Sequence, residues 1–304
     1  MPAPVPEVPS VTFDDDELAR GTPREATVMA ACALFRTAGA LRLHRAVPLA
    51  LHAELDAHYR SRYAWELAGT SKDDRRPLFT VDLEGPFGRR AFYANPLILP
   101  IIERLLGADC ILGALSSVVS FPGAAAQFTH RDSPSLFDDY AFDVNLPPYA
   151  LTLLLPLIDA DETTGSTEVW PGSHNEPDLQ RVTERAPIHP VVPRGSVMLT
   201  DSRVVHRGAQ NRSELVRPLV YMSFHRHWFR DYGGYEARPP IAISPLVFSK
   251  VSAEHRRLFA WRFDPYWKIR VKRQAKRVAR ELVPAPLRTP FQKALRRVLN
   301  RRAP

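Results

Sequence analysis

Two histidines and one aspartate in this sequence have the types and the spacing of a metal site. His130 and Asp132 lie two residues apart in the segment Phe-Thr-His-Arg-Asp at 128–132. Side chains two apart on an extended strand leave the same face, so both could bind one ion. His206 ends a later apolar segment and adds a second imidazole. Two histidines and one carboxylate, with other positions open, are the ligand set of non-haem Fe(II) oxygenases.

An arginine follows these three residues at a position from which it could bind a cosubstrate carboxylate. Arg217 comes eleven residues after His206 and begins the apolar segment Arg-Pro-Leu-Val-Tyr-Met-Ser-Phe. A planar guanidinium binds a carboxylate through two hydrogen bonds, so it could hold the distal end of a dicarboxylate whose keto-acid end chelates iron. Each element alone is a weak signal, because His-x-Asp pairs occur by chance and strand arginines are usually exposed. Their joint order is a much stronger signal.

These motifs resemble the phytanoyl-CoA dioxygenase family of Fe(II)/2-oxoglutarate-dependent oxygenases. The resemblance covers roughly residues 25 to 230. It includes a Phe-x-x-x-Gly turn at 35–39 and a Pro-Gly-Ser-His turn at 171–174, besides the His-x-Asp pair and the late histidine. Asn211 also stands in the family's relative place.

The resemblance assigns a role to each matching position. It implies that iron is bound by His130, Asp132 and His206, and that 2-oxoglutarate is bound by Arg217. It also leads us to expect that Thr152, in the segment Leu-Thr-Leu-Leu-Leu, faces the cosubstrate.

The carboxylate at position 132 bears on the reaction. Related halogenases resemble this pattern but have a small residue there, which leaves a coordination site for chloride. Asp132 therefore favours oxygen transfer. The resemblance implies an enzyme that uses Fe(II), 2-oxoglutarate and O2 to hydroxylate an aliphatic carbon of a small-molecule or lipid-like substrate, with succinate and CO2 as products.

Two alternatives to hydroxylation remain open from the sequence. The same iron site could run desaturation, cyclisation, epimerisation or demethylation, and only product analysis separates these. The other alternative is a non-enzymatic membrane-associated adaptor that has kept the fold. The intact set of ligands argues against the adaptor, since a pocket released from chemistry has no physical need for them.

Further histidines do not fit the ligand set. We interpret His174, in the Pro-Gly-Ser-His turn, as structural. His225 and His227 have same-face spacing but lack a nearby carboxylate in the motif, so we place them in the pocket wall or the core. Asn211 and Ser213 are expected to fix the loop before the arginine.

The elements that must position these residues are mainly strands. Short apolar segments separated by Pro, Gly, Asp and Asn favour an antiparallel sandwich or jelly roll. The predicted strands are 110–121, 125–130, 149–158, 166–170, 187–192, 196–201 and 217–225. We therefore predict a mainly β fold, a cupin-like double-stranded β-helix. The loop at 131–148 is expected to form a lid or part of the substrate wall.

Helices are predicted before this region. Thr22, Pro23 and Glu25 have the pattern of a helix start, which predicts a helix to about Thr37. A strand is expected at 40–44, a second helix from near Pro48 and a third over 96–106 before a glycine.

We predict three parts of the chain from composition. They are a disordered leader at 1–21, a dioxygenase domain at 22–250 and an aromatic, basic helical extension at 251–304. The leader prediction rests on its prolines and on the acidic residues 14–17.

The net charge of +8 comes from the extension. Residues 268–304 contain thirteen Lys or Arg against the single acid Glu281. We expect the aromatic cluster at 259–267 to pack on the barrel. The last amphipathic helix either packs there or contacts an anionic membrane. Nucleic acid is a weaker hypothesis, because no stacking or base-reading motif accompanies the charge.

Apolar segments, the start of the chain and the cysteines indicate where in the cell the protein is expected. No apolar segment has the roughly 20 residues that span a bilayer, and the start of the chain lacks the pattern of a secretory signal. Two cysteines do not form a disulfide framework, which fits a reducing compartment. We expect a cytoplasmic protein, held peripherally at the inner face of the membrane if the tail binds lipid.

Overall fold

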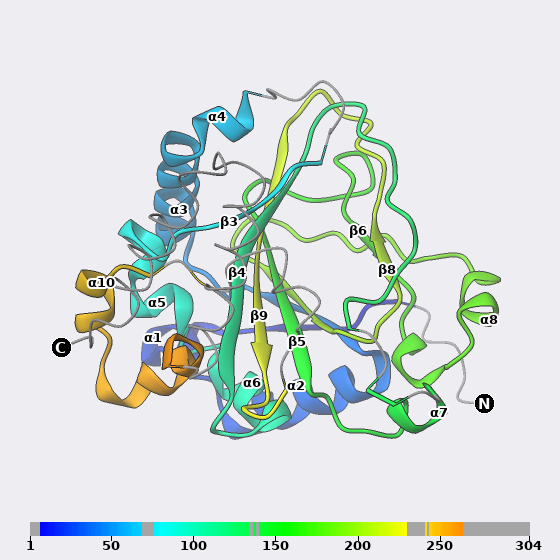
Figure 1. The fold of residues 1–304 in the computed structure, drawn as a ribbon, viewed down its shortest axis with the longest axis horizontal. Coiled ribbons are helices and arrows are strands. Elements are labelled where there is room, and N and C mark those ends of the chain that lie inside the picture. The colour runs from blue at the N-terminus through cyan, green and yellow to red at the C-terminus, as the bar shows by residue number, and fades with distance from the viewer. Residues whose placement is uncertain are drawn as a thin grey trace, which may run out of the picture. The chain divides into compact units, whose positions relative to one another are not determined.

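Figure 1 shows the fold in the computed structural model, which describes residues 7–68, 76–133, 136–137, 140–229, 241 and 243–263. The chain divides into two compact units, Met1–Leu258 and Phe259–Pro304. The first unit contains all elements that position the site. The predicted basic helical tail falls outside the described residues. No helix in the described part of the chain is long and apolar enough to cross a membrane.

A large mixed sheet forms the centre of the first unit. Its order is β1-β2-β7-β5-β9-β4-β3, in which β1 and β2 are parallel and all other pairs are antiparallel. The strands are β1 Ser10–Thr12, β2 Ala40–His44, β3 Leu78–Thr80, β4 Ile111–Ser120, β5 Ala150–Pro156, β7 Val197–Asp201 and β9 Arg217–His225. A second sheet pairs β6 Thr167–Val169 with β8 His206–Gly208. The predicted mainly β character is confirmed.

An apolar cluster lies between the two sheets. The register pairs Leu154 of β5 with Met198 of β7 on one side and with Tyr221 of β9 on the other, so these side chains share a face. They pack with Val169 of β6 and with Leu219. This shared face forms the wall of the candidate site, and the opposite face of the large sheet contributes leucines and valines to the main core.

Helices lie beside the large sheet (Figure 1). Of the predicted helices, α3 spans Leu49–Arg62 and buries Leu51, Leu55 and Tyr59 as its spacing predicts. The other helices are α1 Asp15–Arg20, α2 Glu25–Ala38, α4 Ala64–Leu67, η1 Gly85–Gly88, α5 Arg90–Tyr93, α6 Leu99–Leu106, α7 Tyr140–Asp143, η2 Ser173–Asn175, α8 Leu179–Thr183, α10 Pro245–Ser249 and η3 Ala253–Phe263. Gly39 ends α2 in the left-handed region, as expected.

The prediction of a disordered leader is wrong for residues 10–20. β1 pairs with β2 and Phe13 is fully buried. The acidic residues begin a helix, because Asp14 and Glu17 form a capping box in which each side chain accepts the other's backbone N–H, at 3.0 and 3.1 Å. Composition suggested disorder, whereas capping and strand pairing stabilise order.

The predicted start of the first helix, which is α2 in the structure, is also displaced. α2 begins at Glu25 with Arg24 as its N-cap, and Thr22 does not cap it. The carboxylate of Glu17 accepts the Arg24 N–H at 2.8 Å and the Thr27 hydroxyl at 2.6 Å. A side chain from the preceding helix therefore serves the role that we assigned to a local residue.

Two predicted strands are present only as isolated bridges. At 187–192 the structure has bridges at Ile188 and Val192, because the intervening Pro190 cannot donate to a ladder. At 125–130 the only bridge is His130 with His206. There the side chain of Gln127 accepts the Gly208 N–H at 2.8 Å and replaces a backbone acceptor.

Candidate metal and cosubstrate site

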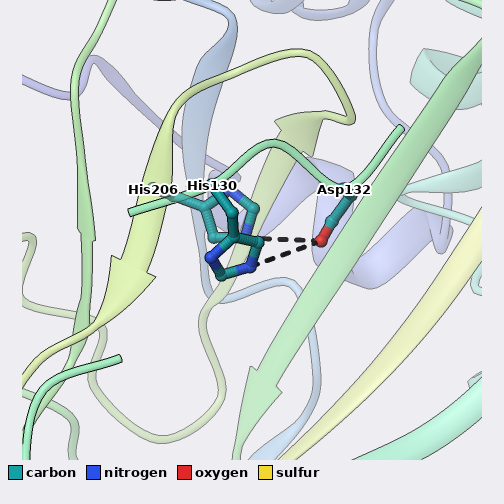
Figure 2. Close-up of side chains that lie close together, drawn as sticks. All are labelled: His130, Asp132 and His206. Atoms are coloured by element: carbon teal, nitrogen blue, oxygen red, sulfur yellow. Dashed lines mark ion pairs between the residues drawn. The ribbon is translucent and has the colours of Figure 1, made fainter. Parts of the chain in front are cut away.

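The three predicted ligands converge at the edge of the small sheet. Their ligand atoms all lie within 4.8 Å of one another. Asp132 Oδ1 is 3.5 Å from His206 Nε2 and 3.9 Å from His130 Nε2. Figure 2 shows both imidazoles directed at the carboxylate. Among the described residues, no other group of histidine, cysteine and acidic side chains has this geometry.

Backbone pairing brings the ligands together. The N–H of His130 and that of His206 each donate to the other's carbonyl at 3.0 Å, which fixes the two histidines opposite each other. The chain then bends, and the N–H groups of Asp132 and Ser133 both donate to the Ser202 carbonyl, at 2.9 and 3.1 Å. The expected same-face geometry of a strand is therefore replaced by a bridge followed by a bend.

Each histidine is oriented by a carbonyl two residues before it. His130 Nδ1 lies 2.9 Å from the Phe128 oxygen, and His206 Nδ1 lies 3.0 Å from the Val204 oxygen. A carbonyl only accepts, so Nδ1 carries the proton and Nε2 has a free lone pair. Both Nε2 atoms face the carboxylate, and this is the arrangement that metal-binding histidines require.

Thr152 holds the third ligand. Its hydroxyl donates to Asp132 Oδ2 at 3.2 Å, which leaves Oδ1 directed at the two histidines. Thr152 lies on the face of β5 that lines the site, in register with Thr200 of β7 and Ser223 of β9. The structure thus places this hydroxyl at a candidate metal ligand, a contact that the sequence did not suggest. The expectation that it faces the cosubstrate remains a prediction.

The charges of the cluster suit a divalent cation. Burial opposes ionisation of Asp132, but the two histidines and the Thr152 hydrogen bond hold its pKa below the usual range. Burial lowers the pKa of His130, and His206 lowers it further. Burial would also lower the pKa of His206, but the carboxylate raises it. An ionised carboxylate therefore faces two imidazole nitrogens, and this donor set fits Fe(II).

The cluster is open on one side. The side chains of Asp132 and His130 are 38% and 25% exposed, whereas that of His206 is 13% exposed. A substrate can therefore approach from the side of the His-x-Asp segment.

The predicted cosubstrate arginine lies in the interior. Arg217 is 1% exposed, and it donates through one terminal nitrogen to the Gly165 carbonyl at 2.7 Å. Its Nε has no hydrogen-bond partner, and no acid among the described residues pairs with it. Burial lowers the pKa of Arg217 to about 9, and the nearby charge of Arg76 acts in the same direction.

A small pocket adjoins this arginine. It is lined by Leu154, Pro156, Ala160, Ser166, Thr167, Val192, Met198, Arg217 and Leu219. The buried hydroxyl of Ser166 also lacks a partner. Buried polar groups are normally hydrogen-bonded. The unpartnered Nε of Arg217 and hydroxyl of Ser166 are therefore suited to donate hydrogen bonds to a bound carboxylate.

Other predicted roles can be compared with the structure. His174 is buried, and its Nε2 lies 3.0 Å from the Arg36 oxygen, as suits a structural residue. Asn211 donates to the carbonyls of Ser120 and Leu215 at 3.0 and 2.8 Å, and so fixes the loop before the arginine. His225 is buried, and the exposed imidazole of His227 lies 2.5 Å from the carboxylate of Asp109.

Sequence reasoning missed two arginines that support the ligands. Arg131, between His130 and Asp132, donates to the carbonyls of Arg203, Ser173 and Glu176 at 3.0, 3.2 and 2.5 Å. Arg203 is 1% exposed and pairs with the buried Asp201 at 2.7 Å. The only sequence signal was the position of each arginine within or next to a ligand segment.

Comparison with known proteins identifies relatives of this chain. The model of the phytanoyl-CoA dioxygenase (PhyH) family matches residues 35–219, more than half of the chain. The dioxygenase trt7 of Aspergillus terreus (strain NIH 2624 / FGSC A1156) is 27% identical over 188 residues, which cover 59% of this chain and 64% of trt7. The match therefore spans less than two thirds of that relative's length.

Solved structures share the fold. The non-heme alpha-ketoglutarate-dependent epimerase SnoN from nogalamycin biosynthesis is 19% identical, with a TM-score of 0.53 and coverage of 66% of this chain and 82% of SnoN. SnoN in complex with Fe3+, alpha-ketoglutarate and nogalamycin RO is 18% identical, with a TM-score of 0.52 and coverage of 66% and 84%.

Proposed function

The chain belongs to the phytanoyl-CoA dioxygenase family, and from that premise we propose that it is an Fe(II)- and 2-oxoglutarate-dependent dioxygenase. Members of this family use Fe(II), 2-oxoglutarate and O2. We propose that this chain hydroxylates an aliphatic carbon of a small-molecule or lipid-like substrate and forms succinate and CO2. The observation that carries the proposal is the convergence of His130, Asp132 and His206 within 4.8 Å.

In this proposal the two sheets enclose the site as a double-stranded β-helix. The two histidines and the aspartate hold the iron, which supplies the activation of O2 when bound. Thr152 keeps one carboxylate oxygen directed at the imidazoles. The Phe128 and Val204 carbonyls hold the protons on Nδ1, so each Nε2 is ready to bind.

Away from the metal ligands, Arg217 binds the distal carboxylate of 2-oxoglutarate. Its unpartnered Nε and the Ser166 hydroxyl supply donors for that anion. The bound carboxylate compensates a charge that burial otherwise disfavours. Leu154, Met198 and Leu219 exclude water around it. The substrate enters on the opposite, solvent-facing side of the cluster.

The same residues could support desaturation, cyclisation, epimerisation or demethylation, and product analysis decides among these outcomes. A membrane adaptor without catalysis is disfavoured, because it has no need for the tautomer-fixed histidines or for a buried unpaired arginine.

The test is an anaerobic titration of the metal-free protein with Fe(II) and 2-oxoglutarate. A keto acid that chelates iron gives a weak visible charge-transfer band. We expect the band in the wild type and its loss in His206→Ala and Arg217→Ala. His227→Ala and Arg194→Ala, which alter exposed ion pairs, are the matched controls and should keep it. Iron binding without a band would refute the assignment of the cosubstrate.

A further inference from the structure

The Pro-Gly-Ser-His turn at 171–174 supplies no group to the iron or to the cosubstrate in the proposed function. It follows β6, and both Ser173 and His174 are buried within it. Two segments that are distant from the turn in sequence contact Ser173. One carries His130 and Asp132, and the other ends at His206. The turn therefore joins the two segments that hold the candidate metal ligands.

The side chain of Ser173 contacts the segment before His206. Its hydroxyl accepts the Val205 N–H at 2.8 Å. The carbonyl of Val205 accepts the Trp170 N–H at 3.0 Å, so both backbone polar groups of this residue are bound by residues 170–173. His206 follows directly in the chain. Its position is therefore fixed by the turn as well as by its bridge to His130.

The backbone of Ser173 contacts the other ligand segment. Arg131 lies between His130 and Asp132, and one of its terminal nitrogens donates to the Ser173 carbonyl at 3.2 Å and to the Glu176 carbonyl at 2.5 Å. A guanidinium presents its donors in one fixed plane, so these contacts determine how the chain passes from one ligand to the next. Ser173 thus receives one hydrogen bond from each ligand segment.

The turn is itself held at the end of α2. The Gly172 N–H donates to the Ala38 carbonyl at 2.7 Å, and His174 Nε2 lies 3.0 Å from the Arg36 oxygen. A Cβ on Gly39 would collide with the His174 imidazole, so this position requires glycine. The Phe-x-x-x-Gly turn and the Pro-Gly-Ser-His turn, which supply no ligand, therefore pack against each other as one support for the ligand segments.

Many buried serines only stabilise the fold, and Ser117 of β4 is an example. It is fully buried, its hydroxyl donates to the Leu219 carbonyl at 3.1 Å, and the Tyr59 hydroxyl lies 2.6 Å away. It pairs with Val220 of β9, on the face of the sheet that contributes to the main core. Ser173 differs because both of its contacts described above come from segments that carry candidate ligands.

We propose that Ser173 is a positioning residue for the metal centre. Its hydroxyl holds Val205 and its carbonyl holds Arg131, so it fixes the separation between His206 and the His-x-Asp segment. This inference rests on the proposed function, in which these segments bind Fe(II). Metal–ligand distances tolerate errors of only about 0.2 Å. A shift of one segment against the other therefore weakens the site without removing a ligand.

The test is a titration of the metal-free protein with Co(II), which takes the same nitrogen and oxygen donors and has a visible absorption band that depends on ligand geometry. We expect Ser173→Ala to bind Co(II) about tenfold more weakly and to show a changed band at saturation. Ser117→Ala is the matched control, since it also loses a buried serine hydroxyl. It should lower the unfolding temperature and keep both the affinity and the band. A wild-type affinity and band in Ser173→Ala would overturn the inference.

A second variant, Arg131→Gln, removes the guanidinium from the Ser173 carbonyl and tests the inference even where Ser173→Ala does not fold. It should also weaken Co(II) binding and change the band, and wild-type behaviour would overturn the inference. Because both contacts act through one residue, the double variant should lose less affinity than the product of the two single losses. A loss equal to that product would show that the contacts act independently and would also overturn it.

Asp132→Ala separates this inference from the proposed function. If the carboxylate is a ligand, this variant binds Co(II) much more weakly than the wild type. Binding that is unchanged in Asp132→Ala would overturn both the metal site and the role of Ser173. Weak binding in Asp132→Ala, together with the wild-type band in Ser173→Ala, would refute the positioning role alone and leave the proposed function in place.

Discussion

The two ends of the candidate site are stabilised in opposite ways. At the metal end each ligand has a hydrogen-bond partner of its own, such as the Phe128 carbonyl for His130 and the Thr152 hydroxyl for Asp132. At the cosubstrate end Arg217 is buried without an acid partner among the described residues, and its pKa is lowered to about 9. The metal end is thus preorganised in the protein alone. In the proposed function, the cosubstrate end is electrostatically incomplete until an anion binds.

This difference predicts how each end responds to substitution. Removing a preorganised ligand should cost binding and leave the fold intact. Removing the buried charge of Arg217 should weaken anion binding, and it should leave the free energy of unfolding unchanged or raise it.

The largest effect is expected for Asp132→Ala. Without the carboxylate two neutral imidazoles remain, and we expect iron affinity to fall by more than the about 10–100-fold that follows loss of an outer partner of a ligand. Turnover of 2-oxoglutarate should fall to background. Calorimetric titration with Fe(II) under anaerobic conditions measures the iron affinity, and succinate formation measures the turnover of 2-oxoglutarate. Unchanged iron affinity in this variant would remove Asp132 from the ligand set.

Arg217→Met tests the incomplete end. Replacing this buried charge by an apolar side chain of similar length removes its desolvation cost, which offsets the loss of the single hydrogen bond to the Gly165 carbonyl. We expect the ligand-free variant to unfold at the same temperature as the wild type or higher, and the stabilisation that 2-oxoglutarate gives to disappear. Calorimetric unfolding with and without 2-oxoglutarate measures both.

A matched control for this variant is Arg226→Met. Arg226 donates to the Pro148 and Leu105 carbonyls at 2.8 and 3.0 Å and does not line the pocket. It should lower the unfolding temperature, because it leaves carbonyls unpaired, and should keep the 2-oxoglutarate effect. A large loss of stability in ligand-free Arg217→Met would show that the guanidinium is already satisfied.

A smaller effect is expected for Thr152→Val at the metal end. Valine keeps the shape and removes the 3.2 Å hydrogen bond to Asp132 Oδ2, so the carboxylate can rotate. Iron affinity should fall by about 10–100-fold with little change in fold stability. Thr152→Ser, which keeps the hydroxyl, should restore most of the affinity. Equal iron affinity in both variants would mean that the hydrogen bond does not orient the ligand.

The smallest effect is expected for Ser166→Ala at the cosubstrate end. The Ser166 hydroxyl is buried without a partner, so its loss should leave ligand-free stability unchanged or slightly higher. Binding of 2-oxoglutarate should weaken by about 0.5–1.5 kcal/mol, the value of one hydrogen bond. Direct titration of the metal-loaded protein measures it. Destabilisation of the ligand-free variant would indicate a partner within the protein.

Parts of the fold followed directly from the sequence. β9 covers Arg217–His225, the bounds predicted from its short apolar segment, and α3 begins at Leu49, beside the predicted start near Pro48. The prediction of a disordered leader failed because proline and aspartate content does not indicate that Asp14 caps a helix or that β1 has a partner strand. The prediction of a strand at 125–130 failed because the side chain of Gln127 replaces a backbone acceptor for the Gly208 N–H. Both failures involve partners that are distant in sequence or belong to side chains.

Residue types alone identify which atoms could bind iron and which group could bind a dicarboxylate, because ligand chemistry belongs to the side chain. The candidates His130, Asp132, His206 and Arg217 can therefore be recognised without the fold. How these groups are held depends on the folded chain. It placed Thr152 on the carboxylate and enclosed the arginine without a counter-charge. The reason is physical: hydrogen bonds and desolvation depend on distances between chain segments, and these distances are set by strand pairing and packing.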